Sequence, residues 1–165
     1  MAKIKPITID FETESIERRP KYPPVPVGFS ILRPGERKGF YHRWGHPTGN
    51  NTTKQAARAV LLDAWKSGLP LLFHNGKFDV DVAEEHMGMP RLSWERYHDT
   101  LYLLFLFDPH AMNLGLKPSA ERLLGMEPEE RDAVADWLID NKVIKKQSRG
   151  KAGAFICMAP GDVVA

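Results

Sequence analysis

The segment Ile7–Thr13, which reads Ile-Thr-Ile-Asp-Phe-Glu-Thr, constrains the fold of this chain more than any other part. Its apolar, β-branched residues favour a strand that emerges from the core. Residues two apart in a strand share a face, so Asp10 and Glu12 project together while Phe11 points the other way. Two such carboxylates repel each other unless a cation lies between them, and hard divalent ions prefer oxygen ligands. The segment therefore predicts a metal site.

The bulk composition sets limits on the class of protein. A chain of 165 residues with 42% hydrophobic and 27% charged residues is typical of one globular domain, and we expect a single domain over residues 1–165. The net charge of +2 does not by itself indicate nucleic-acid binding. The longest apolar run, residues 101–107, is too short to span a membrane. With one cysteine and no signal-peptide pattern, we expect a cytoplasmic protein without membrane contact, as a monomer.

The order of the predicted elements indicates an α/β fold. Strands are predicted at residues 3–13, 27–32, 38–43, 69–74 and 94–98. Helices are predicted at residues 54–66 after capping residues 50–53, through residue 107 after capping residues 99 and 100, and at 77–87, 116–124 and 128–141. Strands first, then strand and helix in alternation, favour a mixed sheet with helices packed on it. We expect residues 145–153, which are basic and contain glycine, to form a flexible loop, and Cys157 to lie in a late strand.

A second pattern, His74-Asn75-Gly76-Lys77-Phe78-Asp79, lies at a predicted strand–turn–helix junction. Asp79 falls in the first helical turn, where the helix dipole favours an acid. Asn75 is a common type of helix cap. Helix stability alone could therefore explain these two residues taken singly. The combination with the first acidic pair is more specific.

Together these residues resemble the motifs of a known superfamily. Asp10-x-Glu12 resembles the first motif of the DnaQ-like, or DEDD, exonucleases, which have an RNase H-like fold, and Asn75-x-x-Phe78-Asp79 is similar to the second. Residues 99–101 and 115–125 resemble a stretch of family A DNA polymerases, in the proofreading 3′–5′ exonuclease domain of phage-type enzymes. The resemblance implies an RNase H-like mixed sheet, an antiparallel meander plus parallel strands, flanked by helices.

The resemblance also implies a reaction, cofactors and partners. It implies hydrolysis of the terminal phosphodiester at the 3′ end of single-stranded DNA during replication, by two Mg²⁺ or Mn²⁺ ions. Asp10 would bridge both ions, Glu12 would hold the ion that activates water, and Asp79 would support the second. The expected substrate-contacting residues are Phe11, Thr13, Asn75 and Phe78. A covalently linked polymerase domain is the expected partner.

The third motif of the family, a tyrosine or histidine four residues before a last aspartate, is missing. The late acid Asp162 has Met158 at that spacing. We therefore expect the chain to stop short of this motif, with Asp162 a weaker candidate for a fourth ligand. Asp99 before Thr100 is an N-cap signature and is kept out of the metal set. A catalytically impaired module that binds DNA or braces a polymerase, and an RNase D-type RNA exonuclease, stay open as alternatives.

Overall fold

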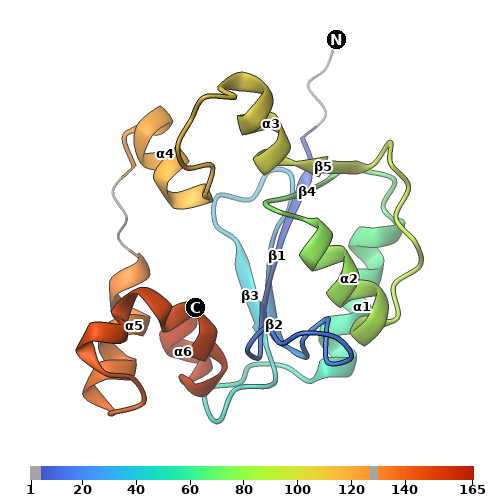
Figure 1. The fold of residues 1–165 in the computed structure, drawn as a ribbon. Coiled ribbons are helices and arrows are strands. Elements are labelled where there is room, and N and C mark those ends of the chain that lie inside the picture. Colours follow the sequence, from blue (N-terminus) through green and yellow to red (C-terminus); the bar gives the residue numbers. More distant parts are fainter. Residues whose placement is uncertain (1–4, 127–129) are drawn as a thin grey trace.

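The computed structural model describes residues 5–126 and 130–165. Within this part, five strands form one sheet in the order β3-β2-β1-β4-β5 (Figure 1). The central strand β1 pairs antiparallel with β2 and parallel with β4, β2 pairs antiparallel with β3, and β4 pairs parallel with β5. The strands are β1 (Ile7–Thr13), β2 (Pro26–Leu32), β3 (Phe40–Arg43), β4 (Leu71–Phe73) and β5 (Tyr97–Asp99). The predicted α/β architecture, a meander plus parallel strands, is confirmed.

The helices also follow the predicted order. They are α1 (Lys54–Lys66), α2 (Lys77–Met87), α3 (Thr100–Phe107), α4 (Leu116–Leu124), α5 (Glu130–Asp140), the 3₁₀ helix η1 (Lys146–Met158) and α6 (Gly161–Val164). The side chain of Thr53 accepts a hydrogen bond from the Ala56 N–H and caps α1, as its position predicts. Residues 3 and 4 of the first predicted strand and 128 and 129 of the last predicted helix lie outside the described residues. No helix within the described ranges has both the length and the apolar character needed to cross a membrane.

The main core lies on one face of the sheet. Ile7, Ile9 and Phe11 of β1 are each at most 5% exposed and pack in one cluster with residues of α1 and α2, including Leu61 and Val82. Figure 1 shows α1 and α2 on this side, and α4, α5 and α6 on the other. Because side chains alternate along β1, burying its odd-numbered residues turns Asp10 and Glu12 toward the second side.

A second, smaller core joins α5 to η1 and corrects two predictions. Residues 145–153, expected as a loop, largely belong to η1, and Cys157, expected in a strand, lies in the same 3₁₀ helix. In a 3₁₀ helix, residues three apart share a face, so Ala152 and Phe155 both reach the cluster that contains Leu138. The period of three, and not strand alternation, explains the apolar positions of this segment.

Candidate active site

The open edge of β1 brings two distant segments together. Within the described residues, β4 pairs with β1 only through Ile7 and Thr8, so this edge of β1 is free of a strand partner further along. The Phe11 N–H donates there to Oδ1 of Asp79, at 2.9 Å. Asp79 is thereby held against the residue that lies between Asp10 and Glu12. The three predicted acids meet at the carboxyl ends of the parallel strands β1 and β4, where ligands bind in open α/β sheets.

Asp99 positions the turn that carries Asp79. At the end of β5 it accepts hydrogen bonds from the backbone N–H groups of Asn75 (3.0 Å) and Gly76 (2.8 Å) and from the Tyr97 hydroxyl (2.7 Å). It also accepts the Leu101 N–H at 2.9 Å, which confirms its predicted N-cap role for α3. Burial acts to raise the pKa of Asp99, but these hydrogen bonds outweigh it and lower the pKa.

Asn75 does not cap α2. The N-cap is Gly76, without a side-chain hydrogen bond, while Asn75 takes a left-handed conformation with φ of 61° and leaves its side chain exposed. Asparagine tolerates this conformation better than most residues because its short polar side chain bonds locally. Gly76 is required for a different reason, since a Cβ there would collide with the Phe73 side chain. The tight turn, and not capping, explains this pair.

The three acids hold their protons unusually strongly. Burial, and next the charge of Asp10, raises the pKa of Glu12 to about 8 and that of Asp79 to about 8. Burial also raises the pKa of Asp10. Asp79 is only 2% exposed, whereas the surface of Asp10 is open to solvent. Asp10 is nevertheless crowded by protein atoms, as a carboxyl on the wall of a cleft would be. Such a cluster favours a bound cation, which would offset the repulsion.

Two further residues near the acids were missed from the sequence. Lys117 on α4 lowers the pKa of Asp10 and of Glu12, against burial. Tyr41 lies in the same row of the sheet as Asp10, because both pair with Ser30 of β2. Burial, and then the charge of Glu12, raises the pKa of Tyr41. The lysine stood within the stretch that resembles family A polymerases, but the row that aligns Tyr41 with Asp10 is visible only once the strands are paired.

Two cavities flank Glu12. One, of about 250 Å³, is lined by Glu12, Lys117, Arg149 and apolar residues that include Ile156. The other, of about 330 Å³, is lined by Glu12, Phe11, Thr13 and Phe78 among others, so it contains three of the four predicted substrate-contacting residues. Asn75 is not part of either lining. Gly153 of η1 borders both cavities, so η1 forms a wall of the candidate site.

The predicted substrate-contacting side chains in this second cavity differ in exposure. Phe11 is 5% exposed, and its ring packs on Phe29 with centroids 5.5 Å apart, so it belongs mainly to the core. Thr13 is 8% exposed, and its hydroxyl donates to the Glu14 carbonyl oxygen. Phe78 is half-buried and is the aromatic side chain of this set with the most accessible surface. A base could stack on Phe78 more readily than on Phe11.

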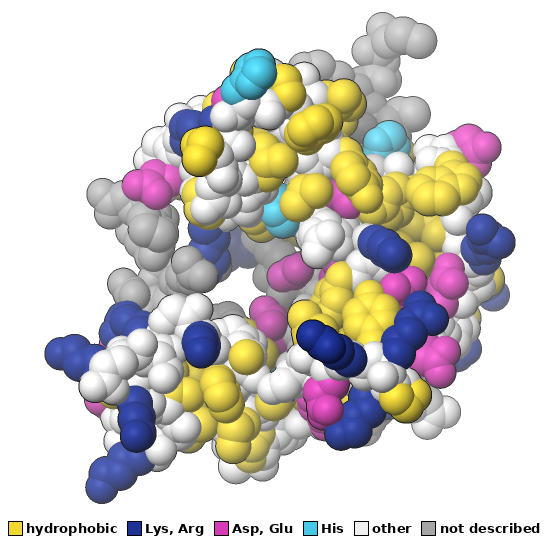
Figure 2. Space-filling view, in the orientation of Figure 1, with side chains coloured by type: hydrophobic (Ala, Val, Ile, Leu, Met, Phe, Trp, Pro, Cys, Tyr) yellow, Lys and Arg dark blue, Asp and Glu magenta, His cyan; other side chains and the backbone are white. Residues whose placement is uncertain are grey.

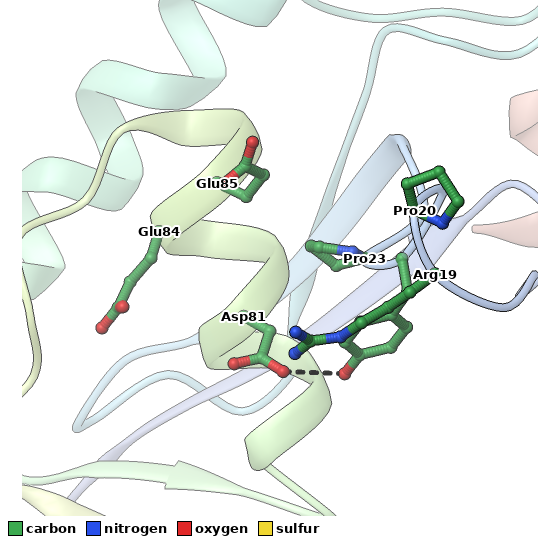
Figure 3. A pocket seen from close by; sticks show the side chains of 7 residues that line it. Arg19, Pro20, Pro23, Asp81, Glu84 and Glu85 are labelled. Atoms are coloured by element: carbon green, nitrogen blue, oxygen red, sulfur yellow. Dashed lines mark hydrogen bonds between the residues drawn. The ribbon is translucent and has the colours of Figure 1, made fainter.

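A larger cavity, of about 760 Å³, lies elsewhere (Figure 3). It separates the loop of Arg19, Pro20 and Pro23 from α2, and its lining includes Asp81, whose carboxylate accepts the Tyr22 hydroxyl at 2.8 Å. None of the three acids lines it. This cavity is larger than the two beside Glu12, so cavity size and the position of the three acids point to different places.

Asp162 occupies a different place from the three acids. It lies in the first turn of α6 and is exposed, and a Cβ added at Gly49 would collide with its carboxylate. The Gly161 N–H donates to the Thr48 carbonyl oxygen at 2.9 Å, which fastens α6 to the loop that follows β3. Asp162 therefore packs on this loop.

The donor chemistry of the three acids fits a hard divalent ion, although the side chains do not form a complete ligand set. Among residues 5–126 and 130–165, no three His, Cys, Asp or Glu side chains are arranged so that they would hold a metal ion as they stand. The Asp79 carboxylate accepts the Phe11 N–H through Oδ1 and also interacts with its own backbone N–H. Carboxylate oxygens in a like-charged cluster are nevertheless the ligands that Mg²⁺ and Mn²⁺ select.

Comparison with solved structures shows that this fold is the fold of known nucleases. No protein-family model and no curated protein matches the sequence. The chain is similar to a nuclease in its apo form (TM-score 0.56, 17% identity, covering 96% of this chain and 66% of the other). It is also similar to Brucella melitensis NrnC with bound Mg²⁺ (TM-score 0.54, 15% identity, covering 94% of this chain and 83% of the other). A third similar structure is the Trypanosoma brucei RNase D complex with GMP (TM-score 0.56, 11% identity, covering 92% of this chain and 48% of the other). The Brucella protein bound to pGG matches as well, at 16% identity. The chain thus spans just under two thirds of the first of these proteins and about half of the RNase D.

Proposed function

We propose that this protein is a metal-dependent 3′–5′ exonuclease that removes terminal nucleotides from single-stranded DNA. The observation that carries the proposal is the meeting of Asp10, Glu12 and Asp79 at the carboxyl ends of β1 and β4, with the pKa of each raised by burial. Three neighbouring acids, of which Asp79 is fully buried, destabilise a fold unless they serve a charged partner. The nuclease fold and the Mg²⁺ bound to the Brucella neighbour support a metal-dependent nuclease.

Each residue of the candidate site has a separate proposed role. Asp10, Glu12 and Asp79 would hold a pair of Mg²⁺ or Mn²⁺ ions through their carboxylate oxygens. When bound, such ions activate a water molecule and stabilise the leaving oxygen of a phosphodiester. Lys117 offsets negative charge beside Glu12 and faces the same cavity, where a phosphate would be attracted. Phe78 offers a stacking surface for a base without selecting its identity.

End-labelled oligonucleotides test the direction and the metal dependence. With Mg²⁺ or Mn²⁺, a 5′-labelled single strand should shorten one nucleotide at a time, and EDTA should stop the reaction. Asp10→Asn should lower the rate at least about 100-fold, because it removes the carboxylate whose charge acts on both other acids. Asp140→Asn, an exposed aspartate of α5, serves as the matched control and should retain the wild-type rate. Full activity of Asp10→Asn would refute the assignment.

An RNA exonuclease of the RNase D type is the second candidate. The likeness to the Trypanosoma brucei RNase D and to Brucella NrnC bound to pGG favours it over a role without catalysis. Matched single strands of DNA and RNA, with the same sequence and label, separate the two candidates through the ratio of their kcat/KM values. If kcat/KM for RNA exceeds that for DNA more than about tenfold, RNA replaces DNA as the proposed substrate.

A further inference from the structure

Helices α3 and α4 expose apolar side chains to an unusual degree. The described residues of α3 include no buried one, and α4 buries only Ser119. The α3–α4 patch, as we call it, consists of Leu103, Leu106, Phe107, Leu116, Leu123 and Leu124, whose exposed fractions run from 44% to 75%. Figure 2 shows apolar side chains gathered over the part of the molecule where Figure 1 draws α3.

The patch consists of two ordered stripes. Leu103, Leu106 and Phe107 follow the spacing that places residues on one face of a helix, and the leucines of α4 do so as well. The two helices contact each other, and an ion pair of 2.7 Å between Asp108 and Arg122 joins the end of α3 to α4. Helix α3 also exposes Tyr102 and Phe105 on its other faces, and a helix that is apolar on all sides is normally buried. The exposed surface of α3 and the leucine stripe of α4 therefore suit a surface that a partner covers.

We propose that a second copy of this chain covers the α3–α4 patch in a symmetric dimer. Each exposed apolar side chain offers on the order of 100 Å², and with the exposed Met112 and Met126 the surface reaches on the order of 800 Å², about what one partner contributes to a stable interface. In a two-fold contact the same patch meets itself.

The charge of the patch suits self-association. A surface that meets its own copy must not carry unpaired like charges, because each would face its equivalent. Residues 100–107 contain no charged residue, and Asp108 and Arg122 neutralise each other. The other charges of α4, Lys117 and Glu121, are opposite in sign, so the helix carries no excess of one charge apart from the paired Arg122. A nucleic acid would need a row of basic residues, which α3 lacks. The expectation of a monomer, drawn from the sequence, gives way here to the proposed dimer.

Sedimentation and light scattering over a micromolar concentration series test the proposal. Wild-type protein should be a dimer. Leu106→Glu with Phe107→Glu should raise the dissociation constant at least about 100-fold, because each substitution occurs twice in a symmetric dimer. Ile16→Glu, at a residue that is 67% exposed outside the patch, is the matched control and should stay dimeric. If the double glutamate variant does not fold by circular dichroism, Leu106→Gln with Leu124→Gln replaces it.

Three results would overturn the proposal, and none of them depends on nuclease activity. The first is a wild-type protein that stays monomeric throughout the series. The second is a folded patch variant that dimerises as tightly as the wild type. The third is a monomer that sediments with neutral phosphatidylcholine vesicles, which would make the patch a lipid-binding surface.

Discussion

The buried carboxyl of Asp79 has a predictable thermodynamic consequence in metal-free protein. Its pKa is about 8 in the fold, mainly through burial, against an ordinary value of 3.8. When the pKa of an acid is higher in the folded than in the unfolded protein, its contribution to stability is fully present at a pH below the unfolded pKa. This contribution is lost as the pH rises toward the folded pKa. At about 1.4 kcal/mol per pH unit, and with part of the effect shared with Asp10, the loss between about pH 4 and pH 8 is about 2–5 kcal/mol.

Asp79→Asn removes this loss while it preserves the local geometry. The amide oxygen of asparagine can still accept the Phe11 N–H, but the side chain carries no charge at any pH. In EDTA, we expect the variant to exceed the wild type in unfolding free energy by about 2–5 kcal/mol near pH 8.5, and by much less near pH 4.5. Urea unfolding at both pH values, followed by circular dichroism, measures the difference.

Added Mg²⁺ provides the second half of the experiment. A cation that binds the ionised acids should stabilise the wild type at about pH 8.5 and should stabilise Asp79→Asn less, because one ligand is lost. Asp140→Asn should follow the wild type under all conditions. If the stability gap between Asp79→Asn and wild type is the same at both pH values in EDTA, Asp79 is not held protonated by the fold, and the electrostatic argument for the site fails.

Three other predictions concern the neighbours of the acids. Asp99→Ala should destabilise the protein by about 3–5 kcal/mol in urea unfolding, since it leaves buried N–H donors without an acceptor, and Asp99→Asn should cost less. If Asp99→Ala is as stable as the wild type, Asp99 does not hold the turn that carries Asp79. Lys117→Met should move the acidic limb of the pH–rate profile upward by about half a pH unit, because the lysine lowers the pKa of Glu12. An unchanged profile would mean that the charge of Lys117 lies too far from Glu12 to affect its pKa. Asp162→Asn should keep the wild-type rate, as its carboxylate packs beside Gly49; a loss of at least about 100-fold would make it a ligand after all.

Local sequence rules were sufficient for most elements of the fold. Alternation along residues 7–13 predicts both the strand and the face that carries the acids, and Asp99 is readable as an N-cap because the motif lies within a few residues. The same rules failed where a longer-range contact decided the outcome. The segment around Ala152 reads as a basic loop, yet its packing against α5 makes it helical.

The sequence by itself determined that Asp10 and Glu12 share a face and that Asp79 lies in the first turn of a helix, because strand alternation and helix dipoles act over a few residues. Only the tertiary structure decided that these segments meet. β4 ends early enough to leave the Phe11 N–H open, and Asp79 accepts it. Only the tertiary structure placed Lys117 beside Glu12 and left the apolar residues of α3 uncovered, since both depend on which surfaces the folded chain brings together.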